Sequence, residues 1–338
     1  MRLPRAVGRL PPKVVRRPLQ VVVLLVGASV VVLSLPLTLP LAALAALLPS
    51  VRSRALRVLA YAVVLVAVEL LGALAALLLW AGGRARDERL HYDVLRALLD
   101  ECVRFARLLG GLHLVTDELG WSPLDDGVPG STNAMVVLGR HAGPGDSLLL
   151  VQTLLDRDHL RRPRIVLKDL LRWDPFVDVY LGRLPNAFLP PGGDSEPMVA
   201  DIADGLGTQD ALLLFPEGGN STPARRRRAV EHLRGRGLHD AARRASRLRN
   251  LLPPRPGGVA AALAAAPHAD VVFVAHAGLD HLSAPADLWR ALPLRTPVRL
   301  RWEFVPAADV PREPAAQVDW LFRTWAEMDA WIEQHRGR

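Results

Sequence analysis

The sequence contains a single cysteine, Cys102, among its 338 residues. An internal disulfide is therefore excluded, and so is a zinc site built from several cysteines. A reducing compartment fits this composition. The protein must be stabilised by packing rather than by covalent cross-links.

Several nucleotide-binding signatures are also missing. The sequence has no Walker loop, no G-x-G-x-x-G pattern of a dinucleotide site and no internal repeat. The net charge of +8 suits an anionic partner. Because no nucleic-acid-binding module and no basic segment interleaved with aromatics is present, nucleic acid is not expected as a partner. An acidic membrane surface or a phosphate-rich substrate remains.

Charge is absent from a long stretch near the start of the chain. Residues 1–17 hold six basic residues and no acidic one, and residues 19–50 carry no charge. A helix needs about 20 apolar residues to cross a bilayer. A connector with three arginines leads to a second, largely apolar run at residues 55–80. The first run is much longer than the roughly 7–15 apolar residues of a signal peptide. We therefore expect residues 1–82 to form a membrane-anchoring helical pair.

The sequence does not decide the membrane topology of this pair, but it predicts on which side of the membrane the rest of the chain lies. Pro36 and Pro40 interrupt the first run, and the arginines of the connector favour the cytoplasmic side, so a shallow hairpin competes with two full crossings. Both arrangements cross the membrane an even number of times. The predicted location is the cell membrane, with residues 83–338 on the cytoplasmic side.

From residue 83 the composition becomes that of a soluble domain. Short apolar runs predict buried strands at residues 133–139, 162–168, 210–215 and 270–276, and an alternating run predicts a half-exposed strand at 298–304. Helical spacing is found at residues 88–111, 195–205, 224–248 and 320–332. The aromatic stripe of the last helix favours core packing. This alternation predicts an α/β domain with a mixed sheet covered by helices.

Gly145-Asp146-Ser147-Leu148 permits an interpretation as the GDSL signature of a serine esterase. That family also needs a downstream Gly-x-Asn-Asp, which is absent, and a late Asp-x-x-His. The Asp-x-x-His present, Asp156 to His159, follows Ser147 too closely. Ser147 also occupies a common helix-capping position, where a helix is expected to begin. A lipid hydrolase using Ser147 is kept as an alternative.

The same segment contains His141 and Asp146 in a His-x4-Asp arrangement. The strand at 133–139 would deliver His141 to a turn, and Asp146 would open the next helix. A carboxylate on one ring nitrogen fixes the histidine tautomer and raises the basicity of the other nitrogen. The pair therefore predicts a general base, although a histidine that merely ends a strand would look the same.

A second turn follows the strand at 210–215, where the sequence reads Phe-Pro-Glu-Gly. Sites in α/β sheets form at the carboxyl ends of strands. His-x4-Asp followed by Phe-Pro-Glu-Gly at this separation resembles the lysophosphatidic acid acyltransferase family of glycerolipid O-acyltransferases. Residues 224–263 and the last helix resemble the branch with lysocardiolipin-type acyltransferases, so the resemblance covers most of residues 84–335.

This resemblance implies the glycerolipid acyltransferase fold for residues 83–338 and an enzyme with His141 and Asp146 as catalytic residues. It implies transfer of a fatty acyl group from acyl-CoA or acyl carrier protein to the hydroxyl of a lysophospholipid, in phospholipid biosynthesis at the bilayer. The expected acceptor is 1-acylglycerol-3-phosphate, and lysophosphatidylinositol, lysocardiolipin or a glycolipid are alternatives. No metal and no cofactor beyond the acyl donor as co-substrate are expected. A non-catalytic membrane-binding protein is a further alternative, which the intact dyad disfavours.

Two blocks depart from the family pattern. The Glu-Gly-Thr-Arg block reads Glu217-Gly218-Gly219-Asn220, so the arginine expected for the acceptor phosphate is missing. Nearby arginines are the predicted replacements, although the run 225–228 is also typical of a solvated or membrane-facing surface. Prolines 190 and 191 likewise occupy the place of an arginine in the preceding block. The predicted substrate-binding residues are Glu217, Gly218, Gly219, Asn220, Arg183, Arg225 and Arg226.

Two further residues have expected roles. Glu217 is expected to organise its turn or the glycerol hydroxyl rather than to act as a base. His276 stands four residues before Asp280, which is the wrong spacing for the family dyad. We interpret His276 as a histidine that ends a strand, and a position lining the site is the alternative.

Overall fold

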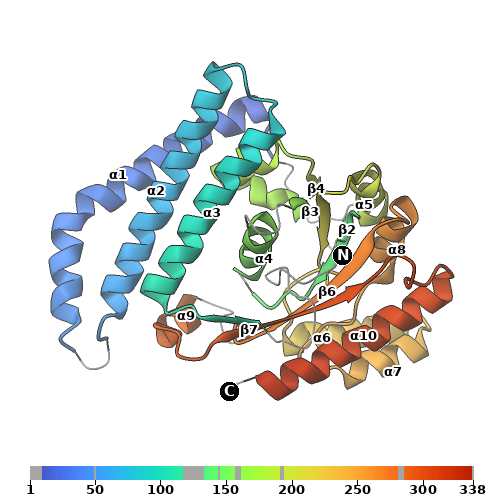
Figure 1. Ribbon diagram of the computed structural model, residues 1–338. Helices are drawn as coiled ribbons and strands as arrows, with labels where there is room; N and C mark the ends of the chain where they lie inside the picture. Colours follow the sequence, from blue (N-terminus) through green and yellow to red (C-terminus); the bar gives the residue numbers. More distant parts are fainter. Residues whose placement is uncertain are drawn as a thin grey trace, which may run out of the picture. The chain divides into compact units, whose positions relative to one another are not determined.

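Two compact units make up the protein (Figure 1). The computed structural model describes residues 10–48, 51–116, 133–143, 145–156, 161–190, 194–280 and 285–336. The first unit, called the N-terminal unit, comprises Met1–Gly110 and Val166–Ser195. The second, called the sheet unit, comprises Gly111–Ile165 and Glu196–Arg338.

The N-terminal unit is built around three helices, α1 (Lys13–Ala45), α2 (Arg54–Ala81) and α3 (Glu88–Gly110). Helices α1 and α2 are long and apolar enough to cross a membrane, and they pack against each other. Many of their leucine and valine side chains are exposed. Helix α1 continues through its internal prolines, and its ribbon bends along its length, as proline requires (Figure 1). The predicted pair of apolar helices is present as a helical hairpin.

Polar contacts tie this hairpin to residues 166–195. These residues form a 3-10 turn η1 (Asp169–Trp173), a π-helical turn η2 (Val177–Leu181) and strand β4 (Ala187–Leu189). The Arg16 guanidinium of α1 lies 2.6 Å from the Asp178 carboxylate, and both side chains are buried. The Tyr180 hydroxyl donates a hydrogen bond of 2.7 Å to the Gly72 carbonyl of α2. A buried ion pair needs such close geometry, because each charge loses its hydration.

The boundaries of the compact units differ from the predicted boundary between residues 82 and 83. Helix α3 packs on α2 and belongs to the same unit, although it is amphipathic rather than apolar. The predicted division into an anchor and an acyltransferase domain concerns function, and it stays a prediction.

A mixed sheet dominates the second unit, with strands in the order β1-β7-β6-β2-β5-β3. The pairs are parallel except β6–β7, which is antiparallel. The bounds are β1 Leu114–Thr116, β2 Met135–Gly139, β3 Arg162–Lys168, β5 Asp210–Leu214, β6 Asp270–Ala277 and β7 Val298–Val305. Residues 162–165 of β3 pair with β5 in this unit, and residues 166–168 pair with β4 in the N-terminal unit. The predicted fold class is confirmed.

Helices cover this sheet. They are α4 (Asp146–Leu155), α5 (Ser195–Ala203), α6 (Pro223–Gly235), α7 (His239–Arg247), α8 (Pro256–Ala265), α9 (Pro285–Ala291) and α10 (Pro314–His335). Helix α10 packs on β6, and the Trp320 and Phe273 rings meet edge to face at 5.1 Å, so the aromatic stripe packs in the core as predicted. The helical stretch predicted at residues 224–248 is present as two helices, α6 and α7. Gly237 has φ +75°, which ends α6 and separates it from α7.

The central strands β2, β5 and β6 are buried throughout, which explains their continuous apolar sequences. Strand β2 lies between β6 and β5, and all three run in the same direction. Their carboxyl ends therefore meet at one edge of the sheet. The segments after Gly139, Leu214 and Ala277 are brought together there.

Candidate active site

His141 and Asp146 form a close pair just beyond the end of β2. The Nδ1 atom of His141 lies 3.2 Å from Oδ1 and 3.1 Å from Oδ2 of Asp146. Gly145, the residue before α4, has φ +110°, a conformation that favours glycine and that lets the chain turn back at this point. Because Nδ1 faces the carboxylate, Nε2 is the ring nitrogen left to take a proton from a substrate. The His141 side chain is 21% exposed, so a substrate can reach it.

Asp146 is buried and is held by backbone donors. Its carboxylate accepts hydrogen bonds from the N–H groups of Ala142 at 2.7 Å, Gly143 at 3.1 Å and Ser147 at 2.6 Å. Burial by itself would raise the pKa of Asp146, but the contacts with the His141 and His276 imidazoles lower that pKa far below its ordinary range. Asp146 is therefore an ionised carboxylate fitted to stabilise a protonated His141.

Glu217 connects the two predicted motifs. Its Oε1 accepts the backbone N–H of His141 at 2.8 Å, and its Oε2 accepts the backbone N–H of Leu252 at 2.8 Å. Burial raises the pKa of Glu217 to about 7, against the opposing effect of these two donors. The Ser221 N–H also binds the His141 carbonyl at 3.0 Å. Glu217 thus organises the turn that carries His141, which agrees with its expected role.

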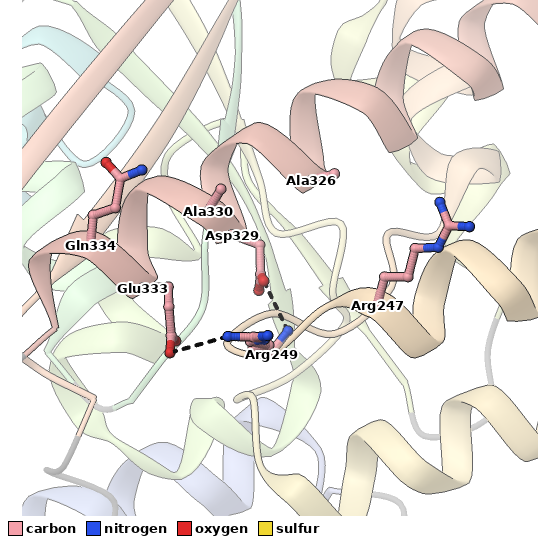
Figure 2. A pocket seen from close by; sticks show the side chains of 7 residues that line it. All are labelled: Arg247, Arg249, Ala326, Asp329, Ala330, Glu333 and Gln334. Carbon is pink, nitrogen blue, oxygen red and sulfur yellow. Dashed lines mark hydrogen bonds and ion pairs between the residues drawn. The ribbon is translucent and has the colours of Figure 1, made fainter.

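Helix α10 binds the segment at residues 249–252, which contacts Glu217. The Trp325 indole N–H donates to the Leu252 carbonyl at 3.0 Å, and the Asp329 carboxylate accepts the N–H groups of residues 249–251. Figure 2 shows Asp329 beside Arg249, in a surface hollow of about 370 Å³. None of the predicted site residues lines this hollow. Its contacts hold the segment that delivers Leu252 to Glu217.

Two arginines flank the turn after Glu217. Gly218 has φ +66°, and a Cβ atom there would lie 2.8 Å from the Arg255 guanidinium carbon. A Cβ atom at Gly219 would lie 2.7 Å from Nη1 of Arg225, and this Nη1 also donates to the Asn220 carbonyl at 3.3 Å. The glycines therefore permit both guanidinium groups to approach the backbone. Guanidinium groups at such a turn suit a phosphate or a carboxylate.

Comparison with known proteins identifies the family of this site. The model of the family described as Acyltransferase matches residues 126–277, just under half of the chain. The matched segment contains the His141 and Glu217 turns and His276. The chain carries a domain of the acyltransferase family. The resemblance found in the sequence is thereby confirmed, and the protein is an acyltransferase.

One solved structure is also similar to the acyltransferase. It is the crystal structure of the 1-acyl-sn-glycerophosphate (LPA) acyltransferase PlsC from Thermotoga maritima, which is 15% identical. The comparison covers 80% of this chain and 97% of that chain, with a TM-score of 0.46. A likeness at this level carries no assignment of substrate. A search of the curated proteins finds no match.

Two of the predicted binding residues of the acyltransferase, Arg226 and Arg183, have contacts with other residues than those of the dyad turns. The Arg226 guanidinium binds the Arg249 carbonyl rather than the turn at residues 218–220. Arg183 belongs to the N-terminal unit, where its guanidinium contacts His91 Nε2 at 3.0 Å and the Ala76 carbonyl at 3.3 Å. Their roles in substrate binding stay predictions.

Ser147 has contacts unlike those of an esterase nucleophile. Its hydroxyl donates to Asp146 Oδ1 at 3.2 Å rather than to an imidazole. Gly145 occupies the N-cap position of α4, so the expectation that Ser147 caps the helix is wrong. A serine nucleophile needs a base within hydrogen-bond reach, and here the adjacent acceptor is a carboxylate that already faces a histidine.

His276 is the residue whose alternative position, lining the site, the structure supports. It is the second-last residue of β6, at the strand end as predicted, and its Nε2 lies 3.6 Å from Asp146 Oδ2, inside the acyltransferase site. The buried Arg140 guanidinium binds both the His276 carbonyl and the Asp280 carboxylate. Its position at the end of a buried strand was the available signal. The order of the strands, which places β6 beside β2, is not written in any local pattern.

Proposed function

We propose that this acyltransferase moves a fatty acyl group from acyl-CoA or acyl carrier protein to the free hydroxyl of a lysophospholipid. The proposed acceptor is 1-acylglycerol-3-phosphate. One observation carries the proposal: a partly exposed His141, backed by the Asp146 carboxylate, stands beside a glycine turn flanked by two guanidinium groups. This reaction needs a base for the acceptor hydroxyl and a binding site for an anionic group.

The proposed reaction uses His141 first as a base and then as an acid. Nε2 takes the proton of the acceptor hydroxyl while the hydroxyl oxygen attacks the thioester carbonyl carbon. A new C–O bond forms and the carbonyl oxygen becomes an oxyanion. When the carbonyl re-forms, the C–S bond breaks, and the thiolate leaves with the proton from His141. Asp146 stabilises the imidazolium between the two steps.

The acceptor phosphate is assigned to the turn at residues 218–220. Arg225 and Arg255 lie beside Gly219 and Gly218, in place of the family arginine that Asn220 replaces. A guanidinium binds a phosphate through two parallel hydrogen bonds, which gives orientation as well as affinity. Backbone N–H groups near the same turn are proposed to stabilise the oxyanion.

We further propose that α1 and α2 anchor the enzyme in the cell membrane, with the catalytic domain on the cytoplasmic side. The exposed apolar side chains of both helices and the six basic residues at the start of the chain support this arrangement.

The test is an acyl-transfer assay on the purified full-length protein in detergent. Labelled acyl-CoA and acyl carrier protein are offered with a panel of lysophospholipids. His141→Ala should lower kcat by about 10²–10⁴-fold, the range for removing a positioned base. Asp146→Asn should also be severely impaired, because the amide can hold the ring in the wrong tautomer. Ser147→Ala should keep most of the activity.

The competing functions give different results in the same assay. A serine hydrolase would release free fatty acid, react with a fluorophosphonate probe and lose both properties in Ser147→Ala. Transfer to lysophosphatidylinositol, lysocardiolipin or a glycolipid in preference to 1-acylglycerol-3-phosphate would reassign the acceptor. If no donor and acceptor give turnover, the result would indicate a membrane-binding protein without acyltransferase activity.

A further inference from the structure

The His276 imidazole is buried without a hydrogen-bond partner. Both of its ring nitrogens lack one among the residues that the structure describes, and its side chain is 2% exposed. Buried polar atoms in proteins nearly always have a partner, so such a ring needs an explanation. The polar group that faces it is Asp146, whose Oδ2 lies 3.6 Å from Nε2.

The position of this ring follows from the sheet. Val274 of β6 pairs with Gly139 of β2, and the Val274 carbonyl accepts the N–H of Arg140 at 3.0 Å. Phe273 contacts α10, so His276, three residues further along, projects from the opposite face of β6. The Arg140 guanidinium holds the His276 carbonyl. The backbone of β6 near His276 is therefore held both by its pairing with β2 and by the Arg140 guanidinium.

We propose that His276 is a positioning residue of the acyltransferase dyad, which shares the Asp146 carboxylate with His141 and sets the basicity of His141. The proposal rests on the function proposed above. His141 Nδ1 faces both oxygens of Asp146, whereas His276 approaches Oδ2 alone. Each N–H directed at this carboxylate restrains its rotation and draws negative charge from it.

The direction of the effect is the same for both protonation states of His276. A neutral ring with its proton on Nε2 directs a dipole at Asp146, and a protonated ring directs a full positive charge. Both weaken the stabilisation that Asp146 gives to protonated His141. Removing the N–H should therefore strengthen that stabilisation.

Other charged groups near the ring do not replace this contact. Arg140 and Asp280 pair with each other, and β7 places the uncharged Leu300 opposite His276. Among the residues that the structure describes, charged and titratable groups near His276 include Asp146 and His141 at the β2–α4 turn, Arg140 after β2 and Asp280 after β6, whereas Arg299 and Arg301 of β7 alternate with Leu300 and lie on the other face of the sheet.

The experiment compares two substitutions in the full-length enzyme in detergent. His276→Phe keeps a planar ring without an N–H, and His276→Gln supplies an N–H that does not titrate. The Phe variant should lower kcat about 10-fold or more, with little change in KM, because the Asp146 carboxylate loses the N–H that restrains its rotation. The acid limb of its pH profile for kcat/KM should move to higher pH. The Gln variant should recover most of the lost kcat.

The control is His268→Phe, in the exposed turn before β6, which should leave the pH profile in place. Equal kcat and equal pH profiles in wild type and His276→Phe would overturn the proposal. Equal losses in the Phe and Gln variants without a shift of the profile would also overturn it, because they indicate packing alone. If the Phe variant does not fold, His276→Leu is measured with the same expectations. A wild-type enzyme without acyl transfer would instead reject the proposed function.

Discussion

Replacing Glu217 by glutamine should loosen the junction between the two turns of the site. The two carboxylate oxygens accept the N–H groups of His141 and Leu252, each at 2.8 Å. A glutamine offers one carbonyl oxygen and one NH₂ group, so one of these buried N–H groups would face another donor. An unsatisfied buried donor costs about 1–3 kcal/mol. We expect the free energy of unfolding to fall by this amount near pH 5.

The size of this loss should depend on pH. Burial raises the pKa of Glu217 from 4.5 to about 7. A carboxyl with a raised pKa binds its proton more tightly in the folded state, so its contribution to stability is complete below pH 4.5 and is lost as the pH rises to about 7. At about 1.4 kcal/mol for each pKa unit, this loss amounts to roughly 3–4 kcal/mol. Because glutamine does not titrate, the unfolding free energy of the Glu217→Gln variant should not show this loss.

The measurement is urea unfolding of the full-length protein in detergent at several pH values between 5 and 8, followed by tryptophan fluorescence. The gap in unfolding free energy between wild type and Glu217→Gln should be largest at pH 5 and should shrink toward pH 8. Glu231→Gln, an exposed glutamate on α6, is the matched control and should show no such trend. A gap that stays constant with pH would refute the titration of Glu217, and the absence of a gap at pH 5 would refute the importance of its two hydrogen bonds.

Two further predictions concern the phosphate site and the membrane. Arg225→Gln should raise the KM for 1-acylglycerol-3-phosphate about 10-fold or more with a smaller change in kcat, because a charged hydrogen bond to the phosphate is lost. Arg228→Gln, further along α6, is the control, and an equal KM in both variants would assign Arg225 to the surface. The full-length protein should stay in the membrane pellet after washes at high salt and at alkaline pH, because α1 and α2 expose long apolar faces. Release into the supernatant would contradict the anchor.

Local patterns were sufficient for the two long apolar helices, the central strands and the dyad. The continuous apolar runs at β2, β5 and β6 mark strands buried on both faces, and the long charge-free runs mark α1 and α2. His141 and Asp146 stand five residues apart, so one turn with a glycine at Gly145 decides their contact. Such short-range geometry depends on neighbouring residues alone. At residues 224–248 the helical spacing was followed through Gly237, so the division into α6 and α7 was not predicted.

Long-range pairing was decided by the tertiary structure. Periodicity shows which side chains are buried, but it does not show which strand lies beside which. The sheet places β6 next to β2, and so brings His276 to Asp146 from more than a hundred residues away in the sequence. The same folding carries Leu252 to Glu217 and Arg255 to Gly218. These contacts join surfaces that are complementary only after the strands and helices have packed, so no local pattern could have predicted them.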